Sequence, residues 1–193
     1  MRKSKASQYL KPLAQEPLQA YLGKGLHTLG LLTWIMEQIG KVECVYVSTY
    51  STSEEFLCGL LNLRNEGMVE HAVLVADIKA AKKTVHLNDL MRQCFDDVFL
   101  AENHSKVLLV HAGDITVSAV TSQNQTYGGR AESTIITINR DVFNSLLSGF
   151  AQITENESVK LYGIHRGTTT ADTGDVGESG FPYGDFRPFG AQE

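Results

Sequence analysis

A continuous apolar run bounded by charge, Ala72-Val73-Leu74-Val75-Ala76, restricts the possible folds more than any other segment. A strand with no polar position is typical of a sheet that is covered on both faces. Such a sheet needs a layer of structure above it and another below it. The run therefore predicts a layered fold with a buried sheet at its centre.

Helical and strand patterns alternate along the chain. Apolar residues at helical spacing predict helices over 26–39, over 52–67, over a short segment at 87–95 and over 139–150. Thr52-Ser53-Glu54-Glu55 has the form of a capping box, with Thr52 as the cap, and Asn139 is the expected N-cap of the last helix. Apolar or Val-rich runs predict strands at 42–47, 72–76, 98–100, 107–110, 115–120 and 134–138. This order predicts an α/β sandwich with a mixed sheet covered by helices.

Polar residues flank the two runs that can pair as a hairpin, 107–110 and 115–120. They are His104, Lys106, Ser122, Asn124 and, a little downstream, Glu132. Residues i and i+2 of a strand share a face, so His104 and Lys106 should point the same way, as should Ser122 and Asn124. An imidazole, an ammonium, a hydroxyl and an amide at one end of a sheet are suited to binding and attacking a phosphate.

Length and charge narrow the function classes. A chain of 193 residues with 42% hydrophobic residues suits one domain with a proper core. Its formal net charge of -5 argues against a protein that coats nucleic acid by positive charge alone. Nucleic-acid contacts would need a local basic site, for which Lys106 and Arg130 are candidates. The basic start Arg2, Lys3 and Lys5 is more typical of a solvated tail.

Cysteine usage and hydropathy suggest the compartment. Cys44, Cys58 and Cys94 are odd in number, widely spaced and set in apolar stretches, which favours reduced thiols over disulfides or a zinc site. The sequence has no run of 18 apolar residues and no apolar segment of secretory length at its start. We expect a soluble cytoplasmic protein without a membrane partner.

Composition divides the chain into three parts. Residues 1–25 are interrupted by Pro and Gly and are expected to form an N-terminal arm, and residues 26–165 are expected to form the domain. Residues 166–193 contain six Gly, two Pro and four aromatic residues, a composition typical of a flexible extension. Its aromatic rings would suit contact with a neighbouring subunit.

A His-x-Lys triplet alone is weak evidence, but its spacing to a second motif adds weight. The sequence resembles the phospholipase D superfamily, whose signature is H-x-K followed one strand later by G-S-x-N. It is most similar to the single-motif bacterial and phage branch. The resemblance spans 26–153 in element order and rests on Asn103-His104-Ser105-Lys106, on Ser122-Gln123-Asn124-Gln125-Thr126 and on Glu132.

The resemblance implies a role for each residue. His104 would attack phosphorus and form a phosphohistidine, while a second imidazole would protonate the leaving oxygen. Lys106, Ser122 and Asn124 would bind the non-bridging phosphate oxygens. Glu132 would accept a hydrogen bond from an imidazole and fix its tautomer. The scheme requires no metal and no cofactor.

This scheme needs two imidazoles, whereas the chain has one motif. None of the other five histidines is followed two residues later by Lys. A two-fold homodimer would bring His104 beside its own copy, because an isologous interface joins identical residues at its axis. The resemblance to single-motif members therefore implies a homodimer.

Two residues depart from the family pattern. His111 stands where the family usually has Asp, with Asp114 three residues further on, and Thr121 replaces the Gly before Ser122. Neither change removes a reacting group.

Structural alternatives remain for each residue. His104 and Lys106 also fit a loop histidine and a lysine that protects a strand edge, and Ser122 and Asn124 fit a capped turn. Glu132 and Arg130 fit a solvated surface pair. Tyr127-Gly128-Gly129 fits a plain turn or a loop whose ring stacks on a base.

The leading hypothesis is a metal-independent phosphodiesterase of phospholipase D type, a nuclease acting on nucleic acid or on another phosphodiester. The first alternative is a non-catalytic protein that keeps the pocket to bind nucleic acid or phosphate, for example in a phage or restriction system. The second is a structural assembly protein whose extension drives association.

Overall fold

A computed structural model describes residues 5–80, 87–126 and 129–163. The predicted extension at 166–193 and residues Tyr127 and Gly128 lie outside the described residues. The described residues belong to one unit of the chain, which ends at Gly163.

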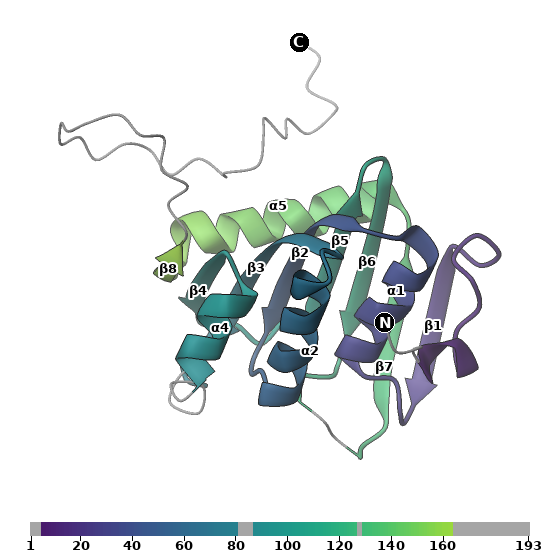
Figure 1. Cartoon of the computed structure of the whole chain (residues 1–193), viewed down its shortest axis with the longest axis horizontal. Helices are drawn as coiled ribbons and strands as arrows, with labels where there is room; N and C mark the ends of the chain where they lie inside the picture. The colour runs from purple at the N-terminus through teal and green to yellow at the C-terminus, as the bar shows by residue number, and fades with distance from the viewer. Residues whose placement is uncertain (1–4, 81–86, 127–128, 164–193) are drawn as a thin grey trace, which may run out of the picture. The chain divides into compact units, whose positions relative to one another are not determined.

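A single mixed sheet of eight strands forms the centre of the described chain, in the order β1-β7-β6-β5-β2-β3-β4-β8 (Figure 1). The strands are β1 (Leu18–Gly23), β2 (Val42–Thr49), β3 (Val69–Asp77), β4 (Asp97–Ala101), β5 (Val107–Ala112), β6 (Ile115–Thr121), β7 (Glu132–Thr137) and β8 (Ser158–Gly163). Strands β2, β3 and β4 are parallel neighbours, and every other pair is antiparallel. The predicted mixed sheet is confirmed.

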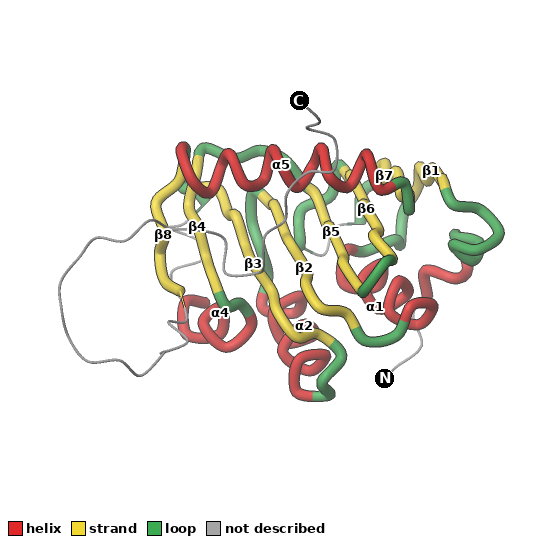
Figure 2. Tube along the Cα trace, turned by 90° about the horizontal axis from the view of Figure 1, so that it is seen from above, coloured by secondary structure: helices red, strands yellow, loops and turns green. Residues whose placement is uncertain are grey.

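Helices cover the two faces of the sheet (Figure 2). α1 (Thr28–Ile39), α2 (Glu54–Asn65) and α4 (Asn88–Cys94) lie on one face, and α5 (Arg140–Asn156) lies on the other. A short 3-10 turn at Lys5–Gln8 contacts α1. The expected sandwich of helices around a mixed sheet is therefore confirmed.

The central run that predicted this architecture is buried on both faces. Every residue of 72–76 in β3 is at most 3% exposed. On one side the core contains Leu32, Ile35, Leu57 and Leu60 of α1 and α2. On the other side Phe150 of α5 packs edge-on against Tyr46 of β2, with ring centroids 5.6 Å apart. Burial of this apolar area is the main stabilising contribution.

Local signals set most helix ends. Gly40 ends α1 with a φ of 79°, a conformation that costs glycine little. Asn139 caps α5 as predicted, because its Oδ1 accepts a hydrogen bond from the Val142 amide at 3.0 Å. The predicted capping residue Thr52 was wrong. Ser53 caps α2 and accepts from the Phe56 amide at 3.3 Å, while the buried Thr52 hydroxyl has no hydrogen-bond partner among the described residues.

The two edge strands differ from the sequence-based expectation. Residues 18–23, which lie in the predicted arm, form β1 and pair with β7 in the register Leu18 to Thr137 and Gly23 to Glu132. Residues 158–163 form β8, which no apolar pattern in the sequence predicts. Edge strands bury little apolar surface, as the 64% exposed Val159 shows. Backbone pairing rather than a hydrophobic pattern selects them.

Candidate functional site

Four strand ends meet at one edge of the sheet. β2 and β5 are antiparallel neighbours, so the end of β2 lies beside the start of β5, where Ser48 pairs with Val107. In the same way, the end of β6 lies beside the starts of β5 and β7. This topology brings the segments at 104–106, 121–126 and 132 to one end of the molecule.

His104 and Lys106 are in direct contact at this edge. The Lys106 ammonium lies 3.3 Å from Nδ1 of His104 and donates a 2.6 Å hydrogen bond to the His104 carbonyl. His104 is exposed, whereas Lys106 is only 9% exposed. Burial lowers the pKa of Lys106, and the negative charges of Glu132 and Asp77 partly oppose that shift. A partly dehydrated cation beside an open imidazole is well suited to attracting an anion.

Ser122 and Glu132 form the second half of this group. The Ser122 hydroxyl donates a hydrogen bond to the Glu132 carboxylate and accepts one from the Ser133 amide at 3.0 Å. The charge of Glu132 acts on Lys106, so the two pairs belong to one electrostatic unit. The structure therefore brings together four of the five predicted residues.

A buried amide holds the His104 segment in place. The Asn103 side chain donates to the Ser48 hydroxyl at 2.9 Å and to the carbonyls of Thr49 and Val75 at 3.3 and 3.2 Å. Its oxygen accepts from the backbone amide and hydroxyl of Ser105 at 3.0 and 2.7 Å. Asn103 thus ties the residues on either side of His104 to β2 and β3. Asn103 belongs to the motif at 103–106, but the motif alone implies no role for it.

Tyr50 is a member of the site that the sequence reasoning missed. Its ring centroid lies 5.4 Å from that of His104, and the Lys106 ammonium lies 5.9 Å from the Tyr50 ring. Its position in the sequence could have indicated this role, because Tyr50 directly follows β2 at the edge where the motifs converge.

Asn124 lies on a turn that two buried glutamines anchor to the helix starts. The Gln123 side chain contacts Nδ1 of His27 at 3.1 Å. The Gln125 amide donates to the Ser51 carbonyl at 3.2 Å, and its carbonyl accepts from the Ser53 hydroxyl at 2.8 Å. The side-chain oxygen of Asn124 is buried and has no hydrogen-bond partner in the described part of the chain.

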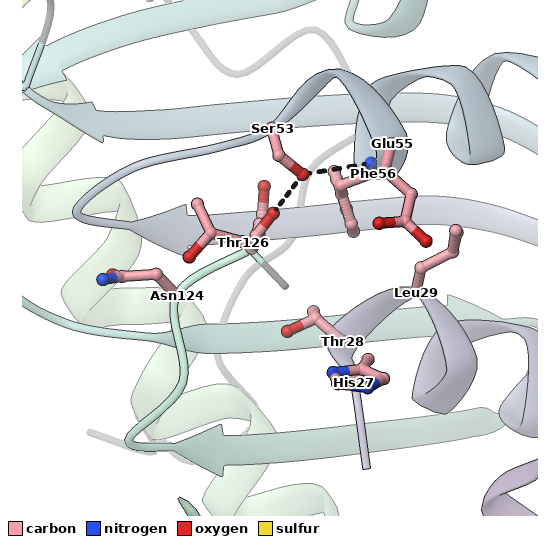
Figure 3. Close-up of a pocket in the computed structure, with 9 residues that line it drawn as sticks. His27, Thr28, Leu29, Ser53, Glu55, Phe56, Asn124 and Thr126 are labelled. Atoms are coloured by element: carbon pink, nitrogen blue, oxygen red, sulfur yellow. Dashed lines mark hydrogen bonds between the residues drawn. The ribbon is translucent and has the colours of Figure 1, made fainter. Parts of the chain in front are cut away.

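A shallow pocket opens beside Asn124, with about 300 Å³ of empty space when the part open to solvent is included (Figure 3). The start of α1 forms one wall, the start of α2 forms another, and the turn at 124–126 closes it. The lining residues are His27, Thr28, Leu29, Ser53, Glu55, Phe56, Asn124, Gln125 and Thr126.

The two residues that depart from the family pattern have structural partners. His111 lies 3.1 Å from Glu43, away from the site edge. The Thr121 hydroxyl donates to the Ser133 carbonyl at 3.0 Å and accepts from the Gln123 amide at 3.2 Å. Thr121 therefore helps to shape the turn that contains Ser122. Arg130, the other basic candidate, is exposed.

The described ranges contain neither a grouped set of metal ligands nor a disulfide. Residues 5–80, 87–126 and 129–163 contain no group of three or more His, Cys, Asp or Glu side chains placed to hold a metal. The three cysteines are free, and burial raises the pKa of Cys44 and of Cys94 to about 12. No described helix is long and apolar enough to cross a membrane.

Sequence comparison gives no relatives, since no family model and no curated protein matches this chain. Solved structures do match its fold. The phospholipase D family member Nuc from Salmonella typhimurium has a TM-score of 0.56 at 16% identity, covering 76% of this chain and 99% of Nuc. Polyphosphate kinase from Porphyromonas gingivalis has a TM-score of 0.53 at 15% identity, covering 72% of this chain but only 26% of the kinase. The described chain shares its fold with these two solved structures, the first of which is a phospholipase D family member.

Proposed function

We propose that this chain is a phosphodiesterase of phospholipase D type, a nuclease that works as a homodimer through a phosphohistidine on His104. The observation behind the proposal is the grouping at one sheet edge of an open imidazole, a partly dehydrated ammonium and a hydroxyl paired with a carboxylate. The likeness to Nuc adds support at the level of fold, because the match covers 99% of the length of Nuc. Fold does not determine the substrate, so the choice of nucleic acid as substrate rests on the resemblance of the motifs.

The proposed reaction has two displacements. His104 of one copy attacks phosphorus, so an N–P bond forms while the P–O bond to the leaving group breaks. The protonated His104 of the second copy gives its proton to that leaving oxygen. The second imidazole, now neutral, takes a proton from water, whose oxygen attacks phosphorus as the N–P bond breaks. The products are an alcohol and a phosphomonoester.

Lys106 links phosphate binding to the state of the nucleophile. In the free protein its ammonium faces Nδ1 of His104. A bound phosphate offers stronger, charged acceptors, so Lys106 would turn to a non-bridging oxygen together with Ser122 and Asn124. Nδ1 is then free to hold the ring proton, and Nε2 can attack.

An exposed apolar face beside the site supports the homodimer. Ala20, Ile135, Val120 and Val107 lie in one register row across β1, β7, β6 and β5. The neighbouring row contains Tyr46, which packs on α5, so both rows belong to the α5 face.

α5 leaves much of this face uncovered. Ile135 is 53% exposed, Val120 43% and Leu22 80%. Leu22 pairs with Ser133, whose carbonyl accepts from the Ser122 amide, so the apolar face continues directly into the site. We propose that the second copy covers this face and thereby supplies the second imidazole.

The first experiment tests catalysis. The protein and its His104→Ala variant are incubated with plasmid DNA and with a chromogenic phosphodiester in EDTA. The proposal expects hydrolysis that survives chelation and falls at least about 10³-fold in the variant. DNA binding without turnover would instead support the non-catalytic alternative, and neither binding nor turnover would favour a structural assembly protein.

Mixed subunits test the shared site. Wild-type protein is co-refolded with a rising excess of His104→Ala subunits. If each reaction uses both copies of His104, activity per wild-type subunit falls in proportion to the wild-type fraction, because a mixed dimer has no complete pair. Constant activity per wild-type subunit would refute a site that spans two copies.

A further inference from the structure

The pocket between α1 and α2 has no task in the two displacements, yet it shares Asn124 with the turn proposed to bind phosphate. Whatever group is attached to a phosphate held by that turn lies next to this pocket. Its walls combine apolar side chains, Leu29 and Phe56, with polar ones, Thr28 and Glu55 (Figure 3).

Three oxygens in the lining have unused hydrogen-bonding capacity. Thr28 Oγ1, Asn124 Oδ1 and Gln125 Oε1 are buried and have no hydrogen-bond partner among the described residues. Thr28 is 8% exposed and Gln125 is 5% exposed, so bulk water gives these residues little compensation. A buried polar atom without a partner calls for a physical reason, and a ligand in the adjoining pocket would supply one. Amide and hydroxyl groups offer such a ligand both donors and acceptors.

The two helix starts differ in the ligand atoms they favour. At α1 the side chain of the N-cap, His27, forms no capping hydrogen bond, and the first turn contains no acidic residue. The amides at this end therefore favour a hydrogen-bond acceptor. At α2, Glu55 presents a carboxylate to the pocket and favours a donor. A matching ligand has acceptors on one side and donors on the other.

We infer that this pocket binds the nucleobase of a nucleotide whose phosphate is held at the proposed site, so the inference rests on the proposed function. A base has an apolar ring face for Leu29 and for the small part of Phe56, 3% exposed, that reaches the pocket lining. The edge of a base has both acceptors and donors. A second phosphate would bring only acceptors toward Glu55. An amine headgroup would bring only donors toward the start of α1.

Two chromogenic substrates test the inference. One is a nucleoside 5′-(4-nitrophenyl) phosphate, and the other is methyl 4-nitrophenyl phosphate, which has no base. Thr28→Val and Glu55→Ala should each lower kcat/KM for the nucleoside substrate at least fivefold more than for the methyl substrate. Glu54→Ala is the matched control, because Glu54 is an exposed glutamate in the same helical turn outside the pocket lining. Equal losses of kcat/KM on both substrates would refute binding of a base in the pocket, while the proposed phosphodiesterase activity would be unaffected.

A binding measurement separates the two proposals if turnover fails. In the His104→Ala background, calorimetry compares a nucleoside 5′-monophosphate with ribose 5-phosphate. The nucleotide should bind at least tenfold more tightly, and Thr28→Val should reduce that advantage at least fivefold. If this binding result were found and wild-type protein showed no hydrolysis, the proposal that the pocket binds a base would stand and the proposal of phosphodiesterase activity would be refuted. Equal binding of the two ligands would refute the pocket.

Discussion

The hydroxyl of Ser122 donates a hydrogen bond to the carboxylate of Glu132, and this pair couples the end of β6 to the start of β7. The same carboxylate acts at a distance on Lys106, whose pKa it raises against the lowering effect of burial. Glu132 therefore acts on two residues proposed to bind phosphate, on Ser122 through a hydrogen bond and on Lys106 through its charge.

Glu132→Gln keeps an acceptor for Ser122 but removes the negative charge. The pKa of Lys106 should fall, so Lys106 should lose its proton at lower pH. We expect the alkaline limb of the profile of kcat/KM against pH to move toward lower pH. Glu102→Gln, which changes an exposed glutamate near the same edge, is the control and should leave that limb in place. An unmoved limb in Glu132→Gln would contradict the electrostatic role of Glu132.

A charge on the apolar face should separate the proposed dimer. Ile135→Asp places a carboxylate between Ala20 and Val120 on this face. Burying it without a partner should weaken dimerisation by about 2 kcal/mol or more, and activity should fall with it. Sedimentation equilibrium measures the association. Val159→Asp, on the opposite edge strand β8, should not affect it, and a dimer that tolerates Ile135→Asp would show that the interface lies elsewhere.

Asn103 should contribute to stability as well as to the geometry of the site. Asn103→Ala leaves the hydroxyls of Ser48 and Ser105 without their shared amide. Loss of this buried network should lower the free energy of unfolding by about 2 kcal/mol, as measured by urea denaturation. Asn62→Ala, an exposed asparagine on α2, should change it by no more than about 0.5 kcal/mol. Comparable losses in the two variants would contradict the network.

Asp96 should make the protein sensitive to acid. Burial acts to raise its pKa, but hydrogen bonds from Arg64 and from the Ala72 amide, with the charge of Arg64, lower the pKa below its ordinary value of 3.8. As the pH falls, Asp96 is therefore protonated in the unfolded chain before it is protonated in the folded chain. The stabilising contribution is complete above pH 3.8 and is lost as pH falls through the lower, folded-state value.

Asp96→Asn removes one partner of this pair. The variant should be less stable than wild type by about 3 kcal/mol at neutral pH, because Arg64 stays partly buried without its counter-ion. The difference should narrow as the pH is lowered below 3.8, which urea unfolding at several pH values would measure. A difference independent of pH would show that packing rather than charge explains the loss.

The sequence allowed the central strands and the covering helices to be predicted because their apolar patterns reflect burial. Ala72 to Ala76 is uninterrupted because β3 is covered on both faces, and Asn139 caps α5 by an interaction local in sequence. β8 escaped prediction because an edge strand such as this one exposes residues like Val159 and has little pattern to read.

In the site, too, the features that are local in sequence could be predicted, and those that depend on long-range packing could not. The spacing of His104, Lys106 and Ser122 around one hairpin suggested their proximity because the hairpin is local. Tyr50 depends on the pairing of β2 with β5, which joins segments about 60 residues apart in sequence and which no short motif encodes. The pocket depends further on how two helix starts approach one turn, and that is a property of tertiary packing.

The pairing of β1 with β7 has a consequence for synthesis on the ribosome. Leu18–Gly23 leaves the exit tunnel long before Glu132–Thr137 has been translated, so the nascent chain must wait with an unmatched strand near its beginning. Docking of that strand is expected to be a late event in folding. Until then, the backbone amides and carbonyls of Leu18–Gly23 that later pair with β7 would be open to capture by a chaperone or by another growing chain.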